Sequence, residues 1–338
     1  MKGRAVLLVN LGSPDAPDEE AVRRYLDEFL MDRYVIQLPW LLRRILVSLF
    51  VLPSRPASSA LAYRSIWWDE GSPLVVISRR VQEALQSRLD MPVAVAMRYG
   101  NPGIESQLVE LAGIPDIQEV LFVPMYPHYA DSTITTSVEE ARRVIRQHNL
   151  NIELRIQAPF YGRSDYIQAL VSSAQPWLDK QFDHILFSYH GLPESHLRNT
   201  DPTGQHCLRE ADCCDIPSAA HATCYRHQIY ETTRCFVEQA GLRDDQYTLA
   251  FQSRLGRAKW LSPASEETIR ELAREGVKHL LVICPAFVTD CLETLEEIGI
   301  RGNEVFVEAG GQSLELVPCL NDNQAWIDVL QSWCLNPE

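Results

Sequence analysis

The sequence predicts an α/β protein built on parallel sheets. Eight short apolar runs are bounded by turn-forming residues, which is typical of buried strands. Helical patterns, with apolar residues three and four positions apart, lie between most of these runs. Strands that alternate with helices favour parallel sheets covered by helices. The expected strands are Ala5–Leu11, Pro92–Met97, Glu119–Val123, Ile152–Ile156, His184–Tyr189, Tyr247–Phe251, His279–Cys284 and Glu304–Val307.

A faint internal repeat predicts two related domains. Residues 8–14 and 188–193 each run from an apolar strand through a polar side chain to Gly and then Pro. Residues 121–126 and 282–287 share an apolar run, a Pro and an aromatic residue two positions later. We infer a boundary between residues 155 and 165. Coincidence is the competing explanation, since turns in α/β proteins favour these residue types.

Three helices carry clear start or stop signals. Ser137-Val138-Glu139-Glu140 is a capping box, which predicts a helix start at Ser137. Ser262-Pro263 predicts another start, with proline at the first helical position, and Gly276 its end. A C-terminal amphipathic helix is expected after Asn321-Asp322. The apolar residues expected on the inner faces are Ala141, Val144, Ile145, Ile269, Leu272, Ala273, Trp326, Ile327, Leu330 and Trp333.

Composition narrows the classes of function. A chain of 338 residues with 46% hydrophobic and 22% charged residues is typical of a soluble globular protein of two domains. The net charge of −14 disfavours a nucleic-acid partner and predicts that anionic ligands are held by local Arg or Lys residues. Met1-Lys2-Gly3-Arg4 leads directly into a strand, so we expect no secretory signal, a cytoplasmic location and nine reduced cysteines.

The longest apolar stretch runs from Tyr34 to Pro53. It contains Pro39 and the central pair Arg43-Arg44, and two guanidinium groups near its middle disfavour a membrane span. One interpretation is an interfacial helix over Trp40–Leu52 that lies on a membrane surface. The other is a helix that covers a pocket within the protein.

Polar and aromatic residues gather where the expected strands end. Ligands of such sheets bind beyond the carboxyl ends of the strands, so we expect these residues to line one cleft between the two domains. Its composition suits a large, flat, mostly apolar ligand, and no GxGxxG or P-loop follows these strands, which disfavours a nucleotide. His190, in His-Gly-x-Pro, is a candidate base, proton shuttle or metal ligand. The strand-end residues are Asn10, Arg98-Tyr99-Gly100, Pro124-Met125-Tyr126-Pro127, His190, Gln252-Ser253-Arg254 and Pro285-Ala286-Phe287.

A row of carboxylates follows the strand that ends at Cys284. Asp290, Glu293 and Glu297 have helical spacing and are expected on one face, with Leu292 and Leu295 towards the core. One interpretation is an ordinary solvated acidic face. The other is a track that leads cations or protons to the cleft, where a neutral imidazole and a carboxylate can bind Fe²⁺.

Four cysteines lie within 18 residues, in the pattern C-x5-C-C-x9-C: Cys207, Cys213, Cys214 and Cys224. This density favours soft-metal binding, although the spacing is not that of paired CxxC units. The alternatives are small buried hydrophobic residues or a redox-active thiol pair. The cysteines elsewhere, Cys235, Cys284, Cys319 and Cys334, are expected to pack within helices and strands.

The motifs taken together resemble those of the ferrochelatases, which insert Fe²⁺ into protoporphyrin IX. The resemblance implies a lyase that releases two protons and gives protohaem in the last step of haem biosynthesis. It also implies two Rossmann-like, chelatase-type domains, each with a parallel four-stranded sheet flanked by helices, and the porphyrin cleft between them. The motifs are Val9–Pro14, Met97–Gly100, Tyr126–Tyr129, Ser188–Pro193, Phe251–Gly256, Lys259–Pro263 and Asp290–Leu295, in the family's order.

The resemblance divides the chain into three parts. Residues 1–158 are expected to form an N-terminal domain, and the apolar stretch 34–53 matches the active-site lip, which implies peripheral membrane contact. Residues 159–320 are expected to form a C-terminal domain with a cysteine-rich insert near 204–227, and residues 321–338 a terminal helix that packs on the domains.

The resemblance also assigns roles in the active site. His190 matches the histidine proposed to take pyrrole protons or to bind the incoming metal, and Glu293 the glutamate that faces it across the porphyrin. Asp290 and Glu297 match an acidic relay. Some members carry a second histidine where this chain has Cys291, so a mechanism that requires that imidazole is in doubt here. The expected porphyrin-binding residues are Asn10, Leu11, Ser72, Arg98, Tyr99, Tyr126, Ser132, Trp260 and Phe287.

Some ferrochelatases carry a 2Fe–2S cluster in an internal segment like residues 204–227, so we predict Cys207, Cys213, Cys214 and Cys224 as its ligands. Two other functions compete with the leading one. A relative that inserts another metal, such as cobalt, into another tetrapyrrole would differ in its metal and ring preference. A haem or porphyrin carrier would bind the ring tightly without inserting metal.

Overall fold

The computed structural model describes residues 3–254, 256 and 258–337. Met1 and Lys2, which entered the argument about a secretory signal, and Leu255 of one motif lie outside the described residues. The chain forms two compact units. Unit 1 comprises Met1–Met125, Asp131–Ala158 and Ile327–Glu338, and unit 2 comprises Tyr126–Ala130 and Pro159–Trp326. The units therefore interleave along the chain, whereas the sequence suggested one boundary after residue 158 and a separate C-terminal segment.

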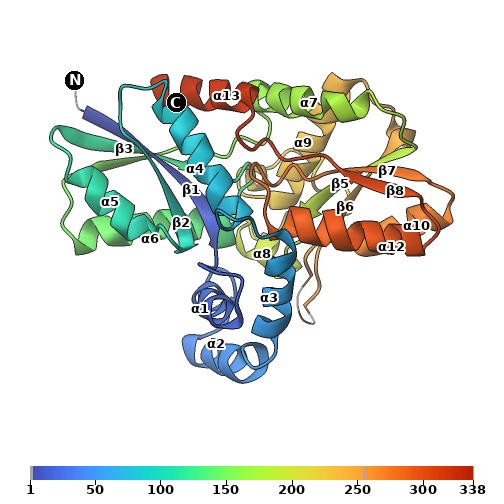
Figure 1. Cartoon of the computed structure of the whole chain (residues 1–338), viewed down its shortest axis with the longest axis horizontal. Coiled ribbons are helices and arrows are strands. Elements are labelled where there is room, and N and C mark those ends of the chain that lie inside the picture. Colours follow the sequence, from blue (N-terminus) through green and yellow to red (C-terminus); the bar gives the residue numbers. More distant parts are fainter. Residues whose placement is uncertain (1–2, 255, 257, 338) are drawn as a thin grey trace. The chain divides into compact units, whose positions relative to one another are not determined.

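Unit 1 contains a parallel four-stranded sheet in the order β2-β1-β3-β4. Residues Ala5–Val9 of the central strand are buried, because helices cover both faces of the sheet (Figure 1). The strands are β1 Gly3–Ser13, β2 Val93–Gly100, β3 Ile117–Pro124 and β4 Glu153–Ile156. The helices that accompany them are α4 Pro73–Gln86, α5 Ile104–Ala112, the π-helical turn η2 Asp131–Thr135 and α6 Thr136–Gln147.

A group of helices in unit 1 lies beyond the carboxyl end of β1 (Figure 1). It comprises α1 Glu19–Leu30, α2 Trp40–Leu46, the π-helical η1 Val47–Val51 and α3 Arg55–Ile66. Within the described residues no single helix is long and apolar enough to cross a membrane. Trp40–Val51 and Arg55–Ile66 satisfy that test only as a pair, which is bent by 69°.

Unit 2 repeats the arrangement with the sheet order β6-β5-β7-β8, again parallel throughout. The strands are β5 His184–His190, β6 Tyr247–Gln252, β7 His279–Ile283 and β8 Ser313–Leu316. The helices are α7 Ser164–Leu178, α8 Glu194–Asn199, η3 Ala219–Ala222, α9 Tyr225–Ala240, η4 Asp244–Gln246, α10 Ser265–Arg274, α11 Leu292–Thr294, the π-helical η5 Leu295–Gly302 and α12 Asn303–Glu308. The two sheets confirm the predicted fold class.

Most of the predicted elements are confirmed, and seven of the eight expected strands are present with small shifts at their ends. The C-terminal helix is α13 Gln324–Leu335, in which Trp326, Ile327, Leu330 and Trp333 are buried as expected. Ile269, Leu272 and Ala273 are also buried, on α10, and that helix ends immediately before Glu275 and Gly276.

The expected strand Glu304–Val307 is wrong. These residues lie in α12, where Phe306 is buried and Val307 is 47% exposed, and the fourth strand of this sheet is β8, Ser313–Leu316. A short apolar run does not by itself distinguish a strand from one turn of a helix. Packing decides here, because a single buried aromatic ring on one helical face satisfies the core, whereas a strand would bury alternate residues.

Two predicted helix starts are also wrong. Ser137 is inside α6, and its hydroxyl donates to the Thr133 carbonyl because the chain is already helical from Asp131. Near the other start, Ala264 is the extended N-cap of α10, and the Pro263 carbonyl accepts a hydrogen bond from Phe251 N. Both starts lie at tertiary contacts, because Thr136 bonds to Arg98 and Asp32 and Pro263 bonds to Phe251.

Candidate active site

His190 is the last residue of β5 and is half-buried. Its Nδ1 lies 2.6 Å from the Gly191 carbonyl oxygen, which can only accept a hydrogen bond. Nδ1 therefore carries the proton, and the lone pair of the neutral ring is on Nε2. The His190 carbonyl accepts a hydrogen bond from the Tyr225 hydroxyl at 2.9 Å, which holds the end of the strand. The arrangement presents Nε2 as a base or a metal ligand.

Gly191 is required by close packing at this strand end. A Cβ atom at this position would lie 2.8 Å from the Gln252 carbonyl oxygen and 3.3 Å from the Trp260 ring. Trp260 therefore lies against the loop after His190, where it also forms a bridge with Pro193. The ring of Phe287, from the segment after β7, lies 6.4 Å from the His190 ring and is inclined at 63° to it.

The predicted row of carboxylates does not form one helical face. Asp290 precedes α11 and is buried, and its carboxylate accepts hydrogen bonds from Thr294 Oγ1 at 2.8 Å and Asn321 Nδ2 at 2.6 Å. Glu297 lies in the π-helical η5, and its carboxylate accepts from the Ser253 backbone N at 2.8 Å and from the Ser253 hydroxyl. The helix begins only at Leu292 and then continues as a wider π-helix. The three carboxylates therefore lack the regular helical spacing expected from the sequence.

Glu293 is in the short helix α11, in the segment after β7, and is half-buried. Its carboxylate accepts a hydrogen bond from the Cys291 thiol, and burial followed by this negative charge raises the pKa of that thiol well above its usual value. Leu292 and Leu295 were expected to lie towards the core, but both are only half-buried. Thr294 and Ile298 are the buried residues of this segment.

Unit 1 places a buried ion pair at the end of β2. Arg98 Nη2 donates to Asp32 Oδ2 at 2.6 Å, and its Nε donates to Thr136 Oγ1 at 2.8 Å. The Tyr99 hydroxyl donates to the same Asp32 oxygen at 2.9 Å, and Tyr34 N donates to Asp32 Oδ1 at 2.7 Å. The Arg98 guanidinium also lies over the Tyr99 ring, 4.4 Å from its centroid. Burial raises the pKa of Tyr99 far above its usual value, so the phenol stays protonated.

Asp32 was not predicted as a site residue from the sequence. Its only local signal is its place immediately before the apolar stretch, in Met31-Asp32-Arg33. Arg98, Tyr99 and Thr136 are more than sixty residues away along the chain, so no spacing pattern connects them with Asp32. Asp32 gathers donors from β2, α6 and the segment that leads to α2.

The remaining predicted pocket residues divide between the units. In unit 1, Asn10 is buried and its side-chain amide donates to Ser78 Oγ at 3.3 Å, and Ser72 is buried at the N-cap of α4. Leu11 and Ser132 are half-buried. In unit 2, Tyr126 is buried. That both sets of residues line one cleft stays a prediction.

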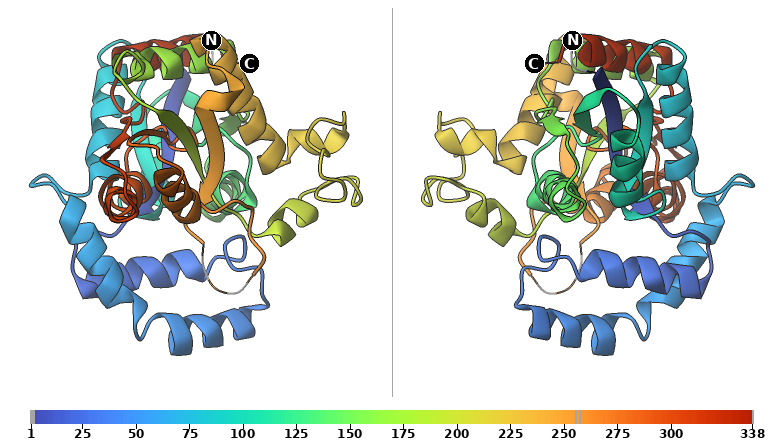
Figure 2. Two further views of the ribbon diagram at one scale, coloured as in Figure 1. Left: turned by 90° about the vertical axis from the view of Figure 1, so that its right-hand side faces the viewer. Right: turned by 90° about the vertical axis from the view of Figure 1, so that its left-hand side faces the viewer.

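The four clustered cysteines converge in unit 2, in a segment that projects from its sheet (Figure 2). The pKa of the Cys224 thiol is lowered to about 6, chiefly because it accepts a hydrogen bond from Cys214, with further hydrogen bonds from His227 N and Cys207. Cys213 Sγ accepts a hydrogen bond from Leu208 N at 3.4 Å. Across the part of the chain that the structure describes, no three His, Cys, Asp or Glu side chains surround the position of a single metal ion.

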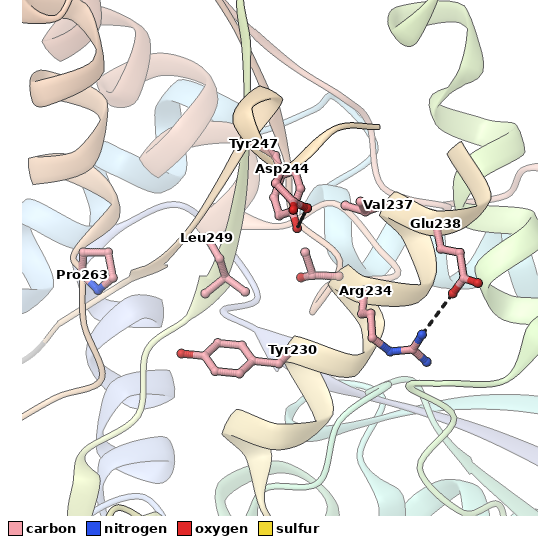
Figure 3. A pocket seen from close by; sticks show the side chains of 9 residues that line it. Tyr230, Arg234, Val237, Glu238, Asp244, Tyr247, Leu249 and Pro263 are labelled. Atoms are coloured by element: carbon pink, nitrogen blue, oxygen red, sulfur yellow. Dashed lines mark hydrogen bonds and ion pairs between the residues drawn. The ribbon is translucent and has the colours of Figure 1, made fainter. Parts of the chain in front are cut away.

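A surface pocket of unit 2 lies away from these residues, between α9 and β6 (Figure 3). Its lining includes Tyr230, Tyr247 and Leu249. Of its charged residues, Arg234 and Glu238 pair with each other at 3.0 Å, and Asp244 is the third. None of the predicted site residues lines it, so we do not assign the chemistry to this pocket.

Comparisons with known proteins identify the family. A solved structure of the sirohydrochlorin chelatase SirB from Bacillus subtilis subspecies spizizenii, in complex with cobalt, matches with a TM-score of 0.53 at 9% identity over 98% of this chain and 93% of that chain, which shows a shared fold. The ferrochelatase of Stutzerimonas stutzeri is 57% identical over 336 residues, 99% of this chain and 98% of the relative. That of Azotobacter vinelandii is 56% identical over 339 residues and 100% of both chains. The sequence model of the ferrochelatase family matches residues 3–337, and the chain therefore belongs to the ferrochelatase family.

Proposed function

We propose that this chain inserts Fe²⁺ into protoporphyrin IX, with His190 and Glu293 as the residues that handle the protons and the metal. Insertion replaces two pyrrole N–H protons with one dication, so the reaction yields protohaem and two protons. The family supplies the reaction, and the His190 tautomer is the observation that carries the assignment of the site. With Nδ1–H held by the Gly191 carbonyl, Nε2 is ready to accept a pyrrole proton or to bind Fe²⁺.

Glu293 supplies the negative charge that this chemistry needs. A carboxylate near a neutral imidazole attracts a first-row dication and accepts protons that leave the ring. Asp290 and Glu297 are the proposed relay from the same segment, since the hydrogen bonds of both carboxylates fix their positions. The hydrogen-bond partners of Asp290 are neutral, whereas Glu297 also lies 3.9 Å from the Arg301 guanidinium at the outer end of the segment.

The porphyrin pocket needs apolar walls and few fixed cations. Trp260 and Phe287 offer aromatic faces next to His190 in unit 2. In unit 1, Arg98 is the proposed partner for an anionic group of the porphyrin, because the net charge of −14 leaves such groups dependent on local cations. Asn10, Leu11, Ser72, Tyr99, Tyr126 and Ser132 complete the proposed pocket.

The first test is His190→Ala, measured in an anaerobic assay with Fe²⁺ and protoporphyrin IX. Loss of a general base is expected to lower turnover by about 10²–10⁴-fold. Porphyrin binding, followed by absorbance, is expected to stay within threefold. Normal turnover would overturn the assignment of His190. A wild-type protein that binds porphyrin tightly without inserting metal would favour the carrier function, and a preference for Co²⁺ and a non-porphyrin ring would favour the relative with another substrate.

We also propose that Cys207, Cys213, Cys214 and Cys224 hold a 2Fe–2S cluster. The four thiols fit such a group, because all are buried and Cys224 has the hydrogen-bond donors that stabilise a thiolate. A cluster of this kind would divide its ligands between two irons, so it does not need three ligands around one position. Purified protein is expected to contain iron and sulfide in equal amounts and to absorb visible light. Cys224→Ser is expected to lose the iron and sulfide and, with them, the absorption. Wild-type protein without iron and sulfide would contradict the proposal.

The apolar segment 34–53 is proposed to touch the membrane surface from the cytoplasmic side. Trp40, Leu41, Leu49 and Phe50 are each more than 60% exposed, which is unusual for adjacent large apolar residues. Arg43 donates to the carbonyls of Ile36 and Leu38, so one of the two central arginines is used within the segment. Sedimentation with lipid vesicles tests this contact.

A further inference from the structure

We propose that Gln252 is the positioning residue that sets Glu293 against His190. The inference rests on the proposed roles of those two residues. Gln252 is the last residue of β6 and is 2% exposed, so it does not meet the substrate directly. In the sheet it is the register partner of His190 on β5.

The backbone of Gln252 fixes the loop that follows His190. Its carbonyl accepts a hydrogen bond from Gly191 N at 2.7 Å. The same Gly191 provides the carbonyl that orients the His190 ring, at 2.6 Å from Nδ1. One peptide of β6 therefore determines where the hydrogen-bond partner of His190 lies.

The side chain of Gln252 reaches the segment that carries Glu293. Its Nε2 donates to the Glu293 carbonyl oxygen at 2.6 Å. Its Oε1 accepts from Ser188 Oγ at 2.7 Å and, more weakly, from Cys284 Sγ at 3.8 Å, and the Ser188 hydroxyl lies 2.8 Å from Ser265 Oγ. The serine contact decides which end of the amide faces Glu293, because a hydroxyl donor selects the oxygen.

Only a residue with both a donor and an acceptor can make these contacts. The two contacts use opposite ends of one planar amide, and both ends are buried. Gln252 thereby connects β5, β6 and the first turn of α11 at the level of the proposed reacting groups. This matters for rate, because a displacement of about 1 Å at a reacting centre can cost about 10²-fold.

The test compares Gln252→Glu and Gln252→Leu with Ser265→Ala. The glutamate keeps an acceptor for Ser188 but turns a carboxylate oxygen towards the Glu293 carbonyl, and the leucine removes both contacts. Ser265→Ala removes the distal hydroxyl and leaves the Gln252–Glu293 contact in place. Turnover, the KM for porphyrin and the midpoint of urea unfolding are measured for each variant.

Both Gln252 variants are expected to lower kcat by about 30–100-fold with the KM for porphyrin within threefold. For Ser265→Ala, kcat and the KM for porphyrin are both expected to stay within threefold of the wild-type values. If the Gln252 variants do not fold, Ser188→Ala takes their place, since it removes the hydroxyl donor and leaves only the Cys284 thiol, 3.8 Å from Oε1, to orient the amide, and a loss of about 3–10-fold in kcat is expected.

The result that overturns the inference is a kcat within twofold of wild type in Gln252→Glu and Gln252→Leu, or in Ser188→Ala where it replaces them. An equal loss in Ser265→Ala would overturn it as well, because a general loosening of the core would then explain both. Parallel assays of His190→Ala and Glu293→Gln separate the two proposals. If those variants keep wild-type turnover, the proposed site fails, and if they lose turnover while the Gln252 variants keep it, only the role of Gln252 fails.

Discussion

The two units end their sheets with different chemistry. At the end of β2 in unit 1, Asp32 and Arg98 form a buried ion pair whose remaining hydrogen bonds go to Tyr99, Thr136 and a backbone N–H. At the end of β5 in unit 2, His190 donates from Nδ1 to the Gly191 carbonyl, which leaves the lone pair of the neutral ring on Nε2. A carboxylate whose hydrogen bonds are made within the protein stabilises the structure and its binding surface. An imidazole or carboxylate with a lone pair that accepts no hydrogen bond is able to take part in a reaction.

The largest expected effect comes from Glu293→Gln in unit 2. The amide has the size of the carboxylate but neither its charge nor its basicity, so kcat is expected to fall by about 10²–10⁴-fold. The free energy of unfolding is expected to stay within about 1 kcal/mol, because the side chain is half-buried. Steady-state kinetics with Fe²⁺ and urea titrations measure the two quantities. A large loss of stability with normal turnover would reverse the contrast between the units.

The matched change in unit 1, Asp32→Asn, is expected to act in the opposite way. It leaves the Arg98 charge without its partner, and removal of one member of a buried pair costs about 3–5 kcal/mol. The KM for porphyrin is expected to rise, while kcat at saturating porphyrin changes less than threefold. Urea titration and porphyrin-dependent kinetics check this. A selective loss of kcat would mean that Asp32 takes part in the reaction.

The pH dependence of stability gives a smaller effect and reports on His128 in unit 2. Burial lowers the pKa of His128 to about 3, and its Nε2 lies 2.9 Å from Thr232 Oγ1. Between about pH 6.5 and pH 3 the unfolded chain binds a proton at this residue and the folded chain does not. Stability from this residue is therefore full above pH 6.5 and falls, by about 1.4 kcal/mol per pH unit, as the pH drops through this window.

His128→Gln removes this titration, so the slope of unfolding free energy against pH from pH 6 to pH 4 is expected to be shallower by up to about 1.4 kcal/mol per unit. Urea titrations at a series of pH values measure the slope. Equal slopes in wild type and His128→Gln would contradict the buried neutral state of His128.

The smallest effect on the reaction is expected from Phe50→Ser. Phe50 is 69% exposed, so stability should change by less than about 0.5 kcal/mol and turnover in detergent-free buffer should be unchanged. Vesicle binding is expected to weaken about tenfold, because a buried aromatic side chain supplies much of an interfacial contact. Val109→Ser on α5, where Val109 is 40% exposed, is the control. Equal binding by both variants would exclude the segment as the contact.

Much of the fold could be predicted because buried parallel strands read as continuous apolar runs. The run at His184–Tyr189 shows this, since it gave both the strand and the position of His190 at its end. The apolar run at Glu304–Val307 was wrongly predicted as a strand, because one turn of a helix is enough to bury the single ring of Phe306. The starts predicted at Ser137 and Ser262 failed for a related reason: Thr136 at the start of α6 bonds to Arg98 and Asp32, and Pro263 bonds to Phe251, so both starts depend on residues elsewhere in the chain.

The sequence by itself determined the order of strands and helices, the family and the identity of the histidine and glutamate proposed for metal insertion. Local composition and contiguous motifs carry that information. Only the tertiary structure decided that Asp32 binds Arg98 and Tyr99, that Gln252 links the strand of His190 to the turn of Glu293, and that residues 295–302 wind as a π-helix. These features depend on hydrogen bonds between residues 41 to 67 positions apart, or on packing that overrides regular helical spacing, and no local pattern encodes either.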